Sequence, residues 1–444
     1  MTPALRSLVS VLVVIAALSG AACKKKEPRP TVEPARPSDI ILVTLDTTRR
    51  DHIGAYGYER PVSPNLDGFA KGADLYTKAY ASSSWTVPTH ASILTGLHAS
   101  DHGAHSSPAG GIIQLRPDVT TLAERLHAQG YATAAIVGAH TINERFGLAR
   151  GFDLYDAPAG ETLLASRRAD AITSRALSWL DANEARPVFL FVNYFDPHIP
   201  YRASGACKER FAKGISPHLG SSSQWLKRPV SENLQLYDAE ICFMDEQFGV
   251  LIEGLKKRGR FENAMIVVAA DHGENFDAEK GIHHGDSLDE ALIRVPLFVK
   301  RPQQQSGTRV DEVFETRSLF YTMLGATKDA EKDPPPTDNV AEDFAVSELW
   351  TGKAEDANPV LRALVRWPLK LLAPPGDGSD ASKLYDLSTP EAESTDLAEK
   401  KSDDKKTLEA LLQTWVAERD GVSGAPVELD PEMVEKLRAL GYLE

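Results

Sequence analysis

The chain has 444 residues, which is enough for one large α/β domain and a smaller one with ample buried core. Its formal net charge is -14, so its surface repels nucleic acid, and we exclude nucleic acid as a partner held by bulk charge. This charge does not exclude one anionic ligand that is held by a metal ion and a few local cations.

The first 23 residues are predicted to be an export signal. Arg6 precedes an apolar run at residues 8–18, which is too short to span a membrane, and small residues lead to Cys23. A cysteine after small residues resembles a bacterial lipoprotein cleavage site, so we expect a lipid anchor on Cys23 and a location in the cell envelope, in the periplasm or on the outer membrane. The alternative is a plain secretory signal and a secreted protein. Residues 24–38 contain three lysines and four prolines, which indicates a solvated tether.

Short apolar runs and longer helical stretches alternate along the chain. Strands buried on both faces are predicted at residues 40–45, 132–137, 188–192 and 266–270. Helices are predicted between them, at residues 120–129, 163–183 and 232–257. This alternation predicts a doubly wound, mostly parallel sheet with helices on both faces, in which ligands bind beyond the carboxyl ends of the strands.

The C-terminal third changes character. Polar loops at residues 303–306 and 328–338 are followed by shorter strand candidates at residues 361–366 and 369–372, and by an amphipathic helix at residues 432–440. We therefore predict a catalytic domain at residues 39–330, and a small α+β subdomain with its tail at residues 331–444.

The chain has three cysteines, and their spacing fits no zinc site. Cys23 belongs to the export segment, which leaves Cys207 and Cys242. These two form a disulfide if the protein folds in an oxidising compartment, or remain ordinary thiols; the sequence leaves both alternatives open.

Polar residues follow three of the predicted strands at the edge where a ligand should bind. Asp46 follows the first strand, His198 lies just after the third, and the pair Asp271 and His272 follows the last. Carboxylate and imidazole groups suit a divalent cation, so we expect Asp46, Asp271 and His272 to converge on one. Taken singly, an aspartate after a strand is more often a helix N-cap.

A serine- and threonine-rich loop leads into another predicted helix. In residues 82–96 the loop becomes helical around Pro88, which is tolerated in a first helical turn. A hydroxyl on Thr86 would lie near the N-terminus of that helix, where anions are favoured. The alternative is that Thr86 serves only as the helix N-cap.

Several motifs occur in the order found in sulfatase-like proteins of the alkaline phosphatase superfamily, at residues 42–57, 86–96, 195–201, 271–274 and 284–296. Residues 384–398 and 437–443 are similar to the C-terminal block and tail of that family. The resemblance covers roughly residues 39–444. It implies the alkaline phosphatase/sulfatase-like fold and a metal-dependent hydrolase or transferase of phosphate or sulfate esters.

The same resemblance implies site residues by position. Asp46, Asp271 and His272 match metal ligands, and Thr86 matches the nucleophile, which also touches the metal. One divalent cation is expected and a second is left open, with calcium, manganese and zinc all retained as candidates.

Four histidines lie at or near other positions of the family's site. His198 and His284 match residues that contact the ester oxygens or assist the leaving group, and each could instead be a structural histidine. His90 stands where sulfatases have an arginine, and His140 lies near a position that is often lysine or histidine. We therefore expect His90 and His140 to bind the substrate.

The nucleophile position departs from the sulfatase pattern. Sulfatases carry Cys or Ser there, in C/S-x-P-S-R, and convert it to formylglycine, whereas residues 86–90 read T-V-P-T-H. Oxidation of a threonine side chain gives a ketone rather than that aldehyde, so Thr86 is expected to act unmodified, as in phosphoryl-transferring relatives. Thr47 stands where many sulfatases have a second aspartate ligand.

We therefore predict a hydrolase or transferase that prefers phosphate esters and forms a covalent intermediate on Thr86. The alternatives are a sulfuric ester hydrolase and a surface lipoprotein that binds anionic glycans without turnover. The expected partners are a small-molecule, glycan or lipid anionic ester, and the membrane if Cys23 is lipidated. The oligomeric state is not predicted.

Overall fold

A computed structural model of the chain describes residues 38–419, except residues 107–111, 159–165, 219–227, 328–342, 352–359, 376–380 and 390–391. The predicted export signal with Cys23, residues 24–37 of the tether and the helix at residues 432–440 lie outside the described residues. The predicted domain boundary at residue 330 lies outside them as well.

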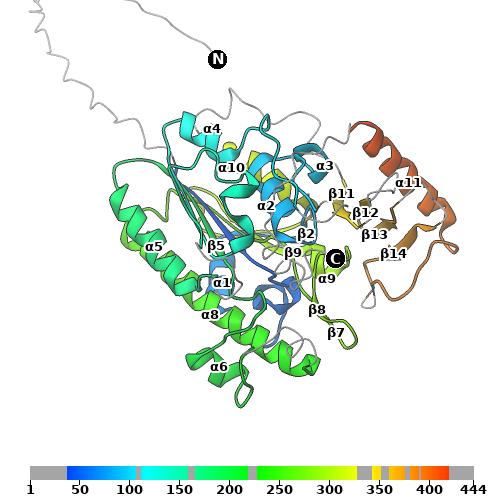
Figure 1. The fold of residues 1–444 in the computed structure, drawn as a ribbon, viewed down its shortest axis with the longest axis horizontal. Helices are drawn as coiled ribbons and strands as arrows, with labels where there is room; N and C mark the ends of the chain where they lie inside the picture. The colour runs from blue at the N-terminus through cyan, green and yellow to red at the C-terminus, as the bar shows by residue number, and fades with distance from the viewer. Residues whose placement is uncertain are drawn as a thin grey trace, which may run out of the picture. The chain divides into compact units, whose positions relative to one another are not determined.

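The core element is an eight-stranded sheet in the order β10-β2-β9-β6-β1-β5-β3-β4 (Figure 1). Its strands are β1 (Ile40–Leu45), β2 (Asp74–Tyr80), β3 (Ala132–Val137), β4 (Leu154–Asp156), β5 (Val188–Tyr194), β6 (Met265–Ala270), β9 (Arg294–Lys300) and β10 (Arg309–Glu315). All pairings are parallel except those of β9, which runs antiparallel to both of its neighbours. The predicted mostly parallel sheet is confirmed, with β9 as the reversed strand.

The four strands predicted from apolar runs form the centre of this sheet. Every residue of β1, β3, β5 and β6 is buried, which is the pattern of strands covered on both faces. The sequence did not predict strands β2, β9 and β10, because their apolar residues are mixed with charged ones. In β9, Pro296 also weakens the strand signal.

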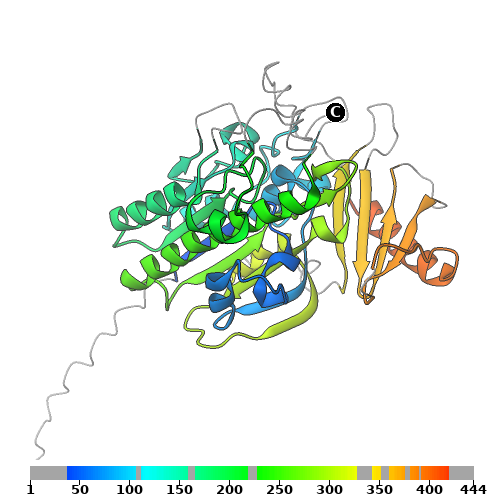
Figure 2. The ribbon, with the colours of Figure 1, turned by 90° about the horizontal axis from the view of Figure 1, so that it is seen from below.

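Helices cover both faces of the sheet. One group consists of α1 (Pro64–Ala70), α5 (Ala169–Ala182), α6 (Gly205–Phe211) and α8 (Val230–Lys257), in which α8 contacts each of the others (Figure 2). The second group consists of α2 (Thr86–Thr95), α4 (Leu122–Ala128) and α10 (Leu319–Leu324), which contact one another. This part also contains two short helices, α3 (Ala99–His102) and α9 (Glu290–Ile293), and a hairpin of β7 (Asn275–Asp277) and β8 (Gly281–His283). Its 3-10 turns are η1 (Arg50–His52), η2 (Gly54–Tyr56), η3 (His140–Ile142), η4 (Glu144–Phe146) and η6 (Thr316–Ser318).

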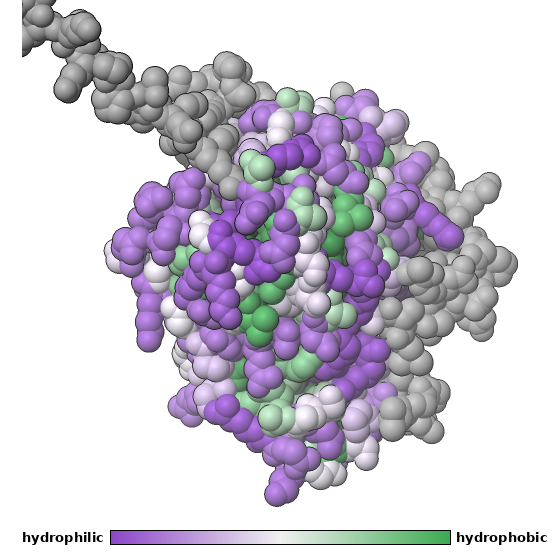
Figure 3. Space-filling view, turned by 90° about the vertical axis from the view of Figure 1, so that its left-hand side faces the viewer, coloured by the Kyte–Doolittle hydropathy of each residue, from purple (hydrophilic) through white to green (hydrophobic). Residues whose placement is uncertain are grey.

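A disulfide joins two of the helices in the first group. Cys207 on α6 is bonded to Cys242 on α8, so the pairing that the sequence left open is present. The outer surface of this group is mainly hydrophilic, with smaller apolar areas (Figure 3). Among the described residues, Leu154 and Val250 are the exposed large hydrophobic side chains. No described helix is both long and apolar enough to cross a membrane.

The described C-terminal part contains an antiparallel sheet and a helix, in line with the predicted α+β subdomain, although this helix is not the predicted one at residues 432–440. Its strands are β11 (Ala345–Trp350), β12 (Val360–Arg366), β13 (Leu369–Ala373) and β14 (Lys383–Asp386), and its helix is α11 (Ser402–Ala417). Leu408, Leu412 and Trp415 of α11 pack on Leu364 and Leu371 of the sheet and form a second small core.

This sheet is also bonded to the chain that leads into α2. The Ser347 hydroxyl donates to the carbonyl of Ala81 at 2.6 Å, and the backbone N–H of Glu348 donates to the carbonyl of Ser82 at 2.9 Å. The C-terminal sheet therefore holds the segment from which Thr86 projects.

Candidate metal centre and active site

Two predicted metal ligands are neighbours because their strands are in register. Leu45, at the end of β1, is paired with Ala270, at the end of β6. Asp46 and Asp271 are the next residues of these parallel strands, so both carboxylates emerge at the same edge of the sheet. Neither residue caps a helix: the first helical turn after Asp46 begins at Arg50 and has Arg49 as its N-cap. The alternative in which Asp46 is a helix N-cap is therefore wrong.

The ligand atoms of Asp46, Asp271 and His272 lie within 4.8 Å of one another, and all three residues are buried. Both carboxylate oxygens of Asp46, and Oδ2 of Asp271, have no hydrogen-bond partner among the described residues. Burial raises the pKa of Asp46 well above its usual range, and the neighbouring Asp271 carboxylate raises that pKa further. Two buried, adjacent carboxylates with unpartnered oxygens are unfavourable alone and favourable around a divalent cation. The donor set fits calcium, manganese or zinc.

The loop after Asp46 is held in a strained conformation. Thr47 has a φ of 50°, in the left-handed region that a β-branched residue rarely adopts. Its backbone N–H donates to Oδ1 of Asp271 at 3.2 Å, and its carbonyl accepts from the Tyr237 hydroxyl at 2.6 Å. These bonds orient the Asp271 carboxylate. Tyr237 lies on α8, far away in sequence, and no local signal marks its contact with this loop.

Thr86 is the first residue of α2, and its hydroxyl points toward His272. The N-cap position is occupied by Trp85, so the alternative in which Thr86 merely caps the helix is wrong. Thr86 Oγ1 lies 3.3 Å from Nε2 of His272, whose Nδ1 lies 2.8 Å from the carbonyl of Gly273. Because a carbonyl can only accept, Nδ1 carries the proton in a neutral ring, and Nε2 then accepts from the Thr86 hydroxyl. Burial lowers the pKa of His272 to about 3, which favours the neutral ring.

His90 lies behind Thr86 and is engaged at both ring nitrogens. Nδ1 lies 2.8 Å from the carbonyl of Thr86, and Nε2 lies 3.0 Å from Oγ1 of Thr44 on β1. These contacts hold the first turn of α2 against the sheet. Both contacts are made within the protein, one to α2 and one to β1. The substrate-binding role of His90 stays a prediction, and its observed contacts describe a positioning residue.

Three of the other histidines lie close together. The ring centroids of His198 and His284 are 5.0 Å apart, and those of His272 and His284 are 4.7 Å apart. Burial lowers the pKa of His198 well below its usual range and that of His284 to about 4. The structure therefore brings these rings to the same edge of the sheet as the carboxylates and the Thr86 hydroxyl.

His140 is farther out. Its ring packs edge-on against Phe195, with a centroid distance of 6.2 Å, and Phe195 in turn stacks on His198 at 4.4 Å. One aromatic ring thus separates His140 from the histidine group, and its substrate-binding role stays a prediction.

Glu274 is the residue of this region to which the sequence motif assigned no role. It is buried, and its Oε1 lies 2.7 Å from Nδ1 of His284. Its Oε2 has no partner among the described residues. Burial raises the pKa of the Glu274 carboxyl to about 8. The sequence offered one signal for a role of Glu274, namely its position in Asp-His-Gly-Glu, three residues after the metal-ligand candidate Asp271.

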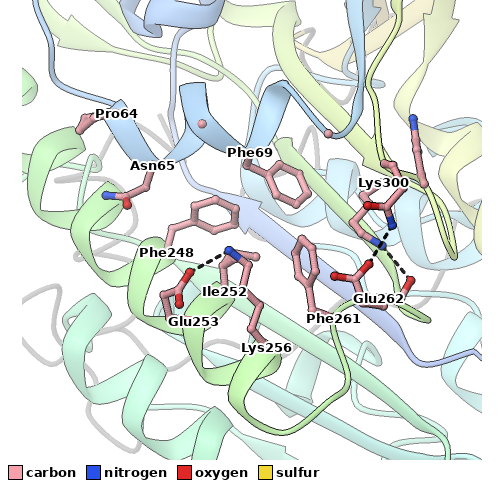
Figure 4. Close-up of a pocket in the computed structure, with 15 residues that line it drawn as sticks. Pro64, Asn65, Phe69, Phe248, Ile252, Glu253, Lys256, Phe261, Glu262 and Lys300 are labelled. Atoms are coloured by element: carbon pink, nitrogen blue, oxygen red, sulfur yellow. Dashed lines mark hydrogen bonds and ion pairs between the residues drawn. The ribbon is translucent and has the colours of Figure 1, made fainter.

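Figure 4 shows a separate pocket. Its volume is about 360 Å³, and its lining includes Phe69, Phe248 and Phe261, with Lys256 and Lys300 at its side. Lys300 is paired with Ile266 near the start of β6, whereas Asp271 follows the end of that strand. The five residues between them span about 16 Å. This pocket contains none of the predicted site residues.

The model of the sulfatase family matches residues 38–330. An ulvan-active sulfatase of Formosa agariphila is 27% identical over 328 residues, which cover 66% of this chain and 62% of that protein. An endo-4-O-sulfatase of Bacteroides thetaiotaomicron is 22% identical over 362 residues, which cover 68% of this chain and 71% of that protein. The chain thus covers slightly less than two thirds of the first of these relatives.

Two solved structures share the fold. The sulfatase YidJ from Bacteroides fragilis has a TM-score of 0.70 at 20% identity and covers 94% of this chain and 100% of its own. A phosphonate monoester hydrolase of Agrobacterium radiobacter has a TM-score of 0.69 at 17% identity and covers 87% of this chain and 96% of its own. The alkaline phosphatase/sulfatase-like fold is confirmed.

Proposed function

The chain belongs to the sulfatase family, and on that premise we propose that it is a metal-dependent ester hydrolase in which Thr86 is the nucleophile. The observation that carries this proposal is the position of one hydroxyl. Thr86 Oγ1 lies 3.3 Å from His272 Nε2, in the residue group that includes the unpartnered carboxylate oxygens of Asp46 and Asp271. A hydroxyl beside metal-ligand side chains is the arrangement that covalent ester cleavage requires.

The reaction proceeds in two steps. A divalent cation bound by Asp46, Asp271 and His272 would lower the pKa of a neighbouring hydroxyl and offset negative charge on the ester oxygens. Thr86 Oγ1 forms a bond to phosphorus while the bond from phosphorus to the leaving alcohol breaks in line, and the proton of the Thr86 hydroxyl passes to water. The N-terminus of α2, at which Thr86 lies, favours the anion. Water then attacks phosphorus, which releases phosphate and returns a proton to Thr86.

We assign the proton for the leaving alcohol to His284 rather than to His198. Nδ1 of His284 faces a carboxylate, whereas Nδ1 of His198 faces the backbone carbonyl of Ile199. When Glu274 is ionised, its carboxylate stabilises the imidazolium that must form before the proton is donated, and a neutral carbonyl does so less. His198 is left to contact the ester oxygens.

We propose phosphate esters as the substrate class because of the nucleophile. Threonine cannot become the formylglycine aldehyde of sulfatases, and an unmodified hydroxyl that forms a phospho-ester is cleared by simple hydrolysis. We propose hydrolysis rather than transfer to an acceptor alcohol, because membership of the sulfatase family supports hydrolysis.

The second candidate is a sulfate ester of a glycan. The relatives favour it, since two of them are an ulvan-active sulfatase and an endo-4-O-sulfatase. A solved structure of the same fold is described in complex with its substrate D-glucosamine-2-N,6-O-disulfate, at a TM-score of 0.70 and 16% identity. If this candidate is correct, Thr86 would have to form and release a sulfo-threonine.

A panel of 4-nitrophenyl esters separates the candidates. The full chain, loaded with calcium, manganese or zinc, would be assayed with the phosphate monoester, the phosphate diester and the sulfate ester. Thr86→Val removes the hydroxyl at nearly constant shape and should lower kcat roughly a thousandfold or more, whereas Thr86→Ser should stay within about tenfold of the wild type. Full turnover by Thr86→Val would refute the nucleophile assignment. A bound metal without turnover of any ester would favour a non-catalytic binding protein.

We also propose that the protein is exported. The disulfide between Cys207 and Cys242 supports an oxidising compartment, in line with the predicted signal and lipid anchor on Cys23. Cell fractionation, with a Cys23→Ser variant as control, tests the anchor: the variant should leave the membrane fraction. Metal analysis of the purified protein gives the identity and number of the cations.

A further inference from the structure

One tyrosine on helix α8 is bonded to the loop that carries the first metal ligand. The hydroxyl of Tyr237 donates to the carbonyl of Thr47 at 2.6 Å and accepts from the backbone N–H of Arg49 at 2.8 Å. This loop directly follows Asp46 at the end of β1, and both Tyr237 and Thr47 are completely buried. A single hydroxyl from a helix that is distant in sequence therefore holds two backbone groups of the loop.

The conformation that this hydroxyl holds is one that threonine rarely adopts. The φ of Thr47 is 50°, in the left-handed region. A β-branched side chain makes this region costly, so the conformation persists only where the surroundings impose it. The Tyr237 hydroxyl supplies part of that constraint, because it bonds the Thr47 carbonyl and the N–H group two residues later.

The loop conformation decides which oxygen of Asp271 is available to a cation. The backbone N–H of Thr47 donates to Oδ1 of Asp271 at 3.2 Å, and the N–H of His272 donates to the same oxygen at 2.8 Å. Oδ2 of Asp271 has no hydrogen-bond partner among the described residues. A Thr47 that left the left-handed region would release Oδ1, and the carboxylate would lose one of the two bonds that orient it.

The ring of Tyr237 is itself held by aromatic neighbours from three segments. His52 and Phe276 pack edge-on against it, each with ring centroids 5.1 Å apart, and Tyr201 packs against it at 5.9 Å. A ring that is fixed in this way presents its hydroxyl without reorganisation. The phenol therefore holds the loop before any cation arrives.

We propose that Tyr237 is a positioning residue that raises the cation affinity of the metal centre by holding Thr47 in its left-handed conformation. This inference rests on the proposed metal-dependent hydrolysis and adds a residue outside the set of metal ligands. Without the hydroxyl, Thr47 relaxes in the metal-free protein, and cation binding must restore its conformation. The affinity then falls, because part of the binding free energy is used to reorder the loop.

Calorimetric titration of the chelator-treated protein with calcium, manganese and zinc measures this effect without turnover. Tyr237→Phe removes only the hydroxyl and should raise the dissociation constant of the cation that the wild type binds best by about tenfold or more. Hydrogen exchange gives a second measurement on the metal-free protein. The amides of residues 46–53 should exchange faster in Tyr237→Phe than in the wild type. Equal dissociation constants in the two proteins would overturn the proposal.

Tyr131→Phe is the matched control. Tyr131 is also buried, and its hydroxyl donates to the carbonyl of Ser38 at 3.1 Å, just before the other end of β1. Both variants lose a bond from a phenol to a backbone carbonyl and should lower the melting temperature. Tyr131→Phe should leave the dissociation constant and the exchange of residues 46–53 unchanged. Equal weakening of cation binding in both variants would reveal a general loss of stability and contradict the positioning role.

Thr47→Gly tests whether the hydroxyl acts through the loop conformation. Glycine adopts a positive φ about as readily as a negative one, so the loop no longer depends on the hydroxyl to reach it. In this background Tyr237→Phe should raise the dissociation constant by about twofold or less. A tenfold loss in both backgrounds would refute the role of Thr47.

These measurements keep the inference separate from the proposed reaction. If the wild type binds none of the three cations, the proposed metal-dependent reaction fails together with the role of Tyr237. If the wild type and Tyr237→Phe bind a cation equally well, only the role of Tyr237 is refuted.

Discussion

Oε1 of Glu274 lies 2.7 Å from Nδ1 of His284, and both side chains are buried beside the Thr86 hydroxyl's partner, His272. This contact fixes the orientation of the His284 ring and places a carboxylate behind it. A carboxylate behind an imidazole stabilises the protonated ring, which is what a donor to a leaving alcohol requires.

Replacement of Glu274 by glutamine tests this contact. Glu274→Gln keeps the size of the side chain and an acceptor for Nδ1, but it removes the charge. We expect kcat to fall roughly 10–100-fold, with a smaller change in KM, because the imidazolium loses its stabilising partner. Steady-state kinetics with one ester measure both constants.

The chain offers a neighbouring pair as the control. His283 Nδ1 lies 2.9 Å from Oδ1 of Asp286, in a pair that is partly exposed to solvent. Asp286→Asn makes the same chemical change at an exposed residue that acts on His284 through its charge alone, so it should lower kcat less than Glu274→Gln does. Equal losses in both variants would contradict a specific role of Glu274.

The disulfide should contribute to stability. Cys207 and Cys242 are separated by 35 residues, and their bond ties α6 to α8. Replacement of both by serine should lower the free energy of unfolding by about 2–4 kcal/mol, since the unfolded chain gains freedom. Urea unfolding with and without reductant measures this change. The reductant should destabilise the wild type and have no effect on the double variant; equal sensitivity of the two proteins would contradict the bond.

Removal of the metal should expose the repulsion between two carboxylates. Asp46 and Asp271 are buried side by side, with unpartnered oxygens. We expect a chelator to lower the melting temperature of the wild type, and the correct cation to restore it. Asp46→Asn should lose this cation-dependent increase, yet in the chelated state it should melt no lower than the wild type, because one buried charge is gone. A lower melting temperature of the chelated variant would show that Asp46 has a structural partner.

The stability of the protein should depend on pH through Asp245, which lies far from the metal ligands in sequence. Its carboxylate on α8 accepts from the backbone N–H groups of Asn65 and Leu66 at the start of α1. Burial outweighs these donors and raises the pKa of Asp245 from 3.8 to about 6. The folded protein therefore binds this proton more tightly than the unfolded chain does. Its contribution to stability is complete below about pH 4 and is lost as the pH rises through about 6.

Asp245→Asn isolates this effect, because asparagine keeps one oxygen acceptor and does not titrate. The free energy of unfolding of the wild type, relative to the variant, should fall between pH 4 and pH 7 by at most about 3 kcal/mol. Urea unfolding at several pH values measures the difference. A difference that is constant over this range would show that the pKa of Asp245 is not raised.

Much of the fold could be predicted because its central strands carry a local signal. Residues 40–45 and 132–137 are apolar except for one threonine each, and they coincide with β1 and β3. Strand β10 carries no such signal, since four of its seven residues are charged and it lies at the edge of the sheet. Its place depends on pairing with β2, which is distant in sequence. Such pairing is a property of the folded sheet and not of the segment.

The sequence by itself determined which residues end the buried strands, because a run of consecutive apolar side chains indicates both that a strand is buried and how long it is. It thereby placed Asp46 and Asp271 at one edge of a parallel sheet. Only the tertiary structure decided the contacts of individual atoms: that both nitrogens of His90 are engaged by Thr86 and Thr44, and that the Tyr201 hydroxyl has no hydrogen-bond partner among the described residues. Such contacts depend on strand register and on the packing of side chains from separate loops, and no single stretch of sequence contains that information.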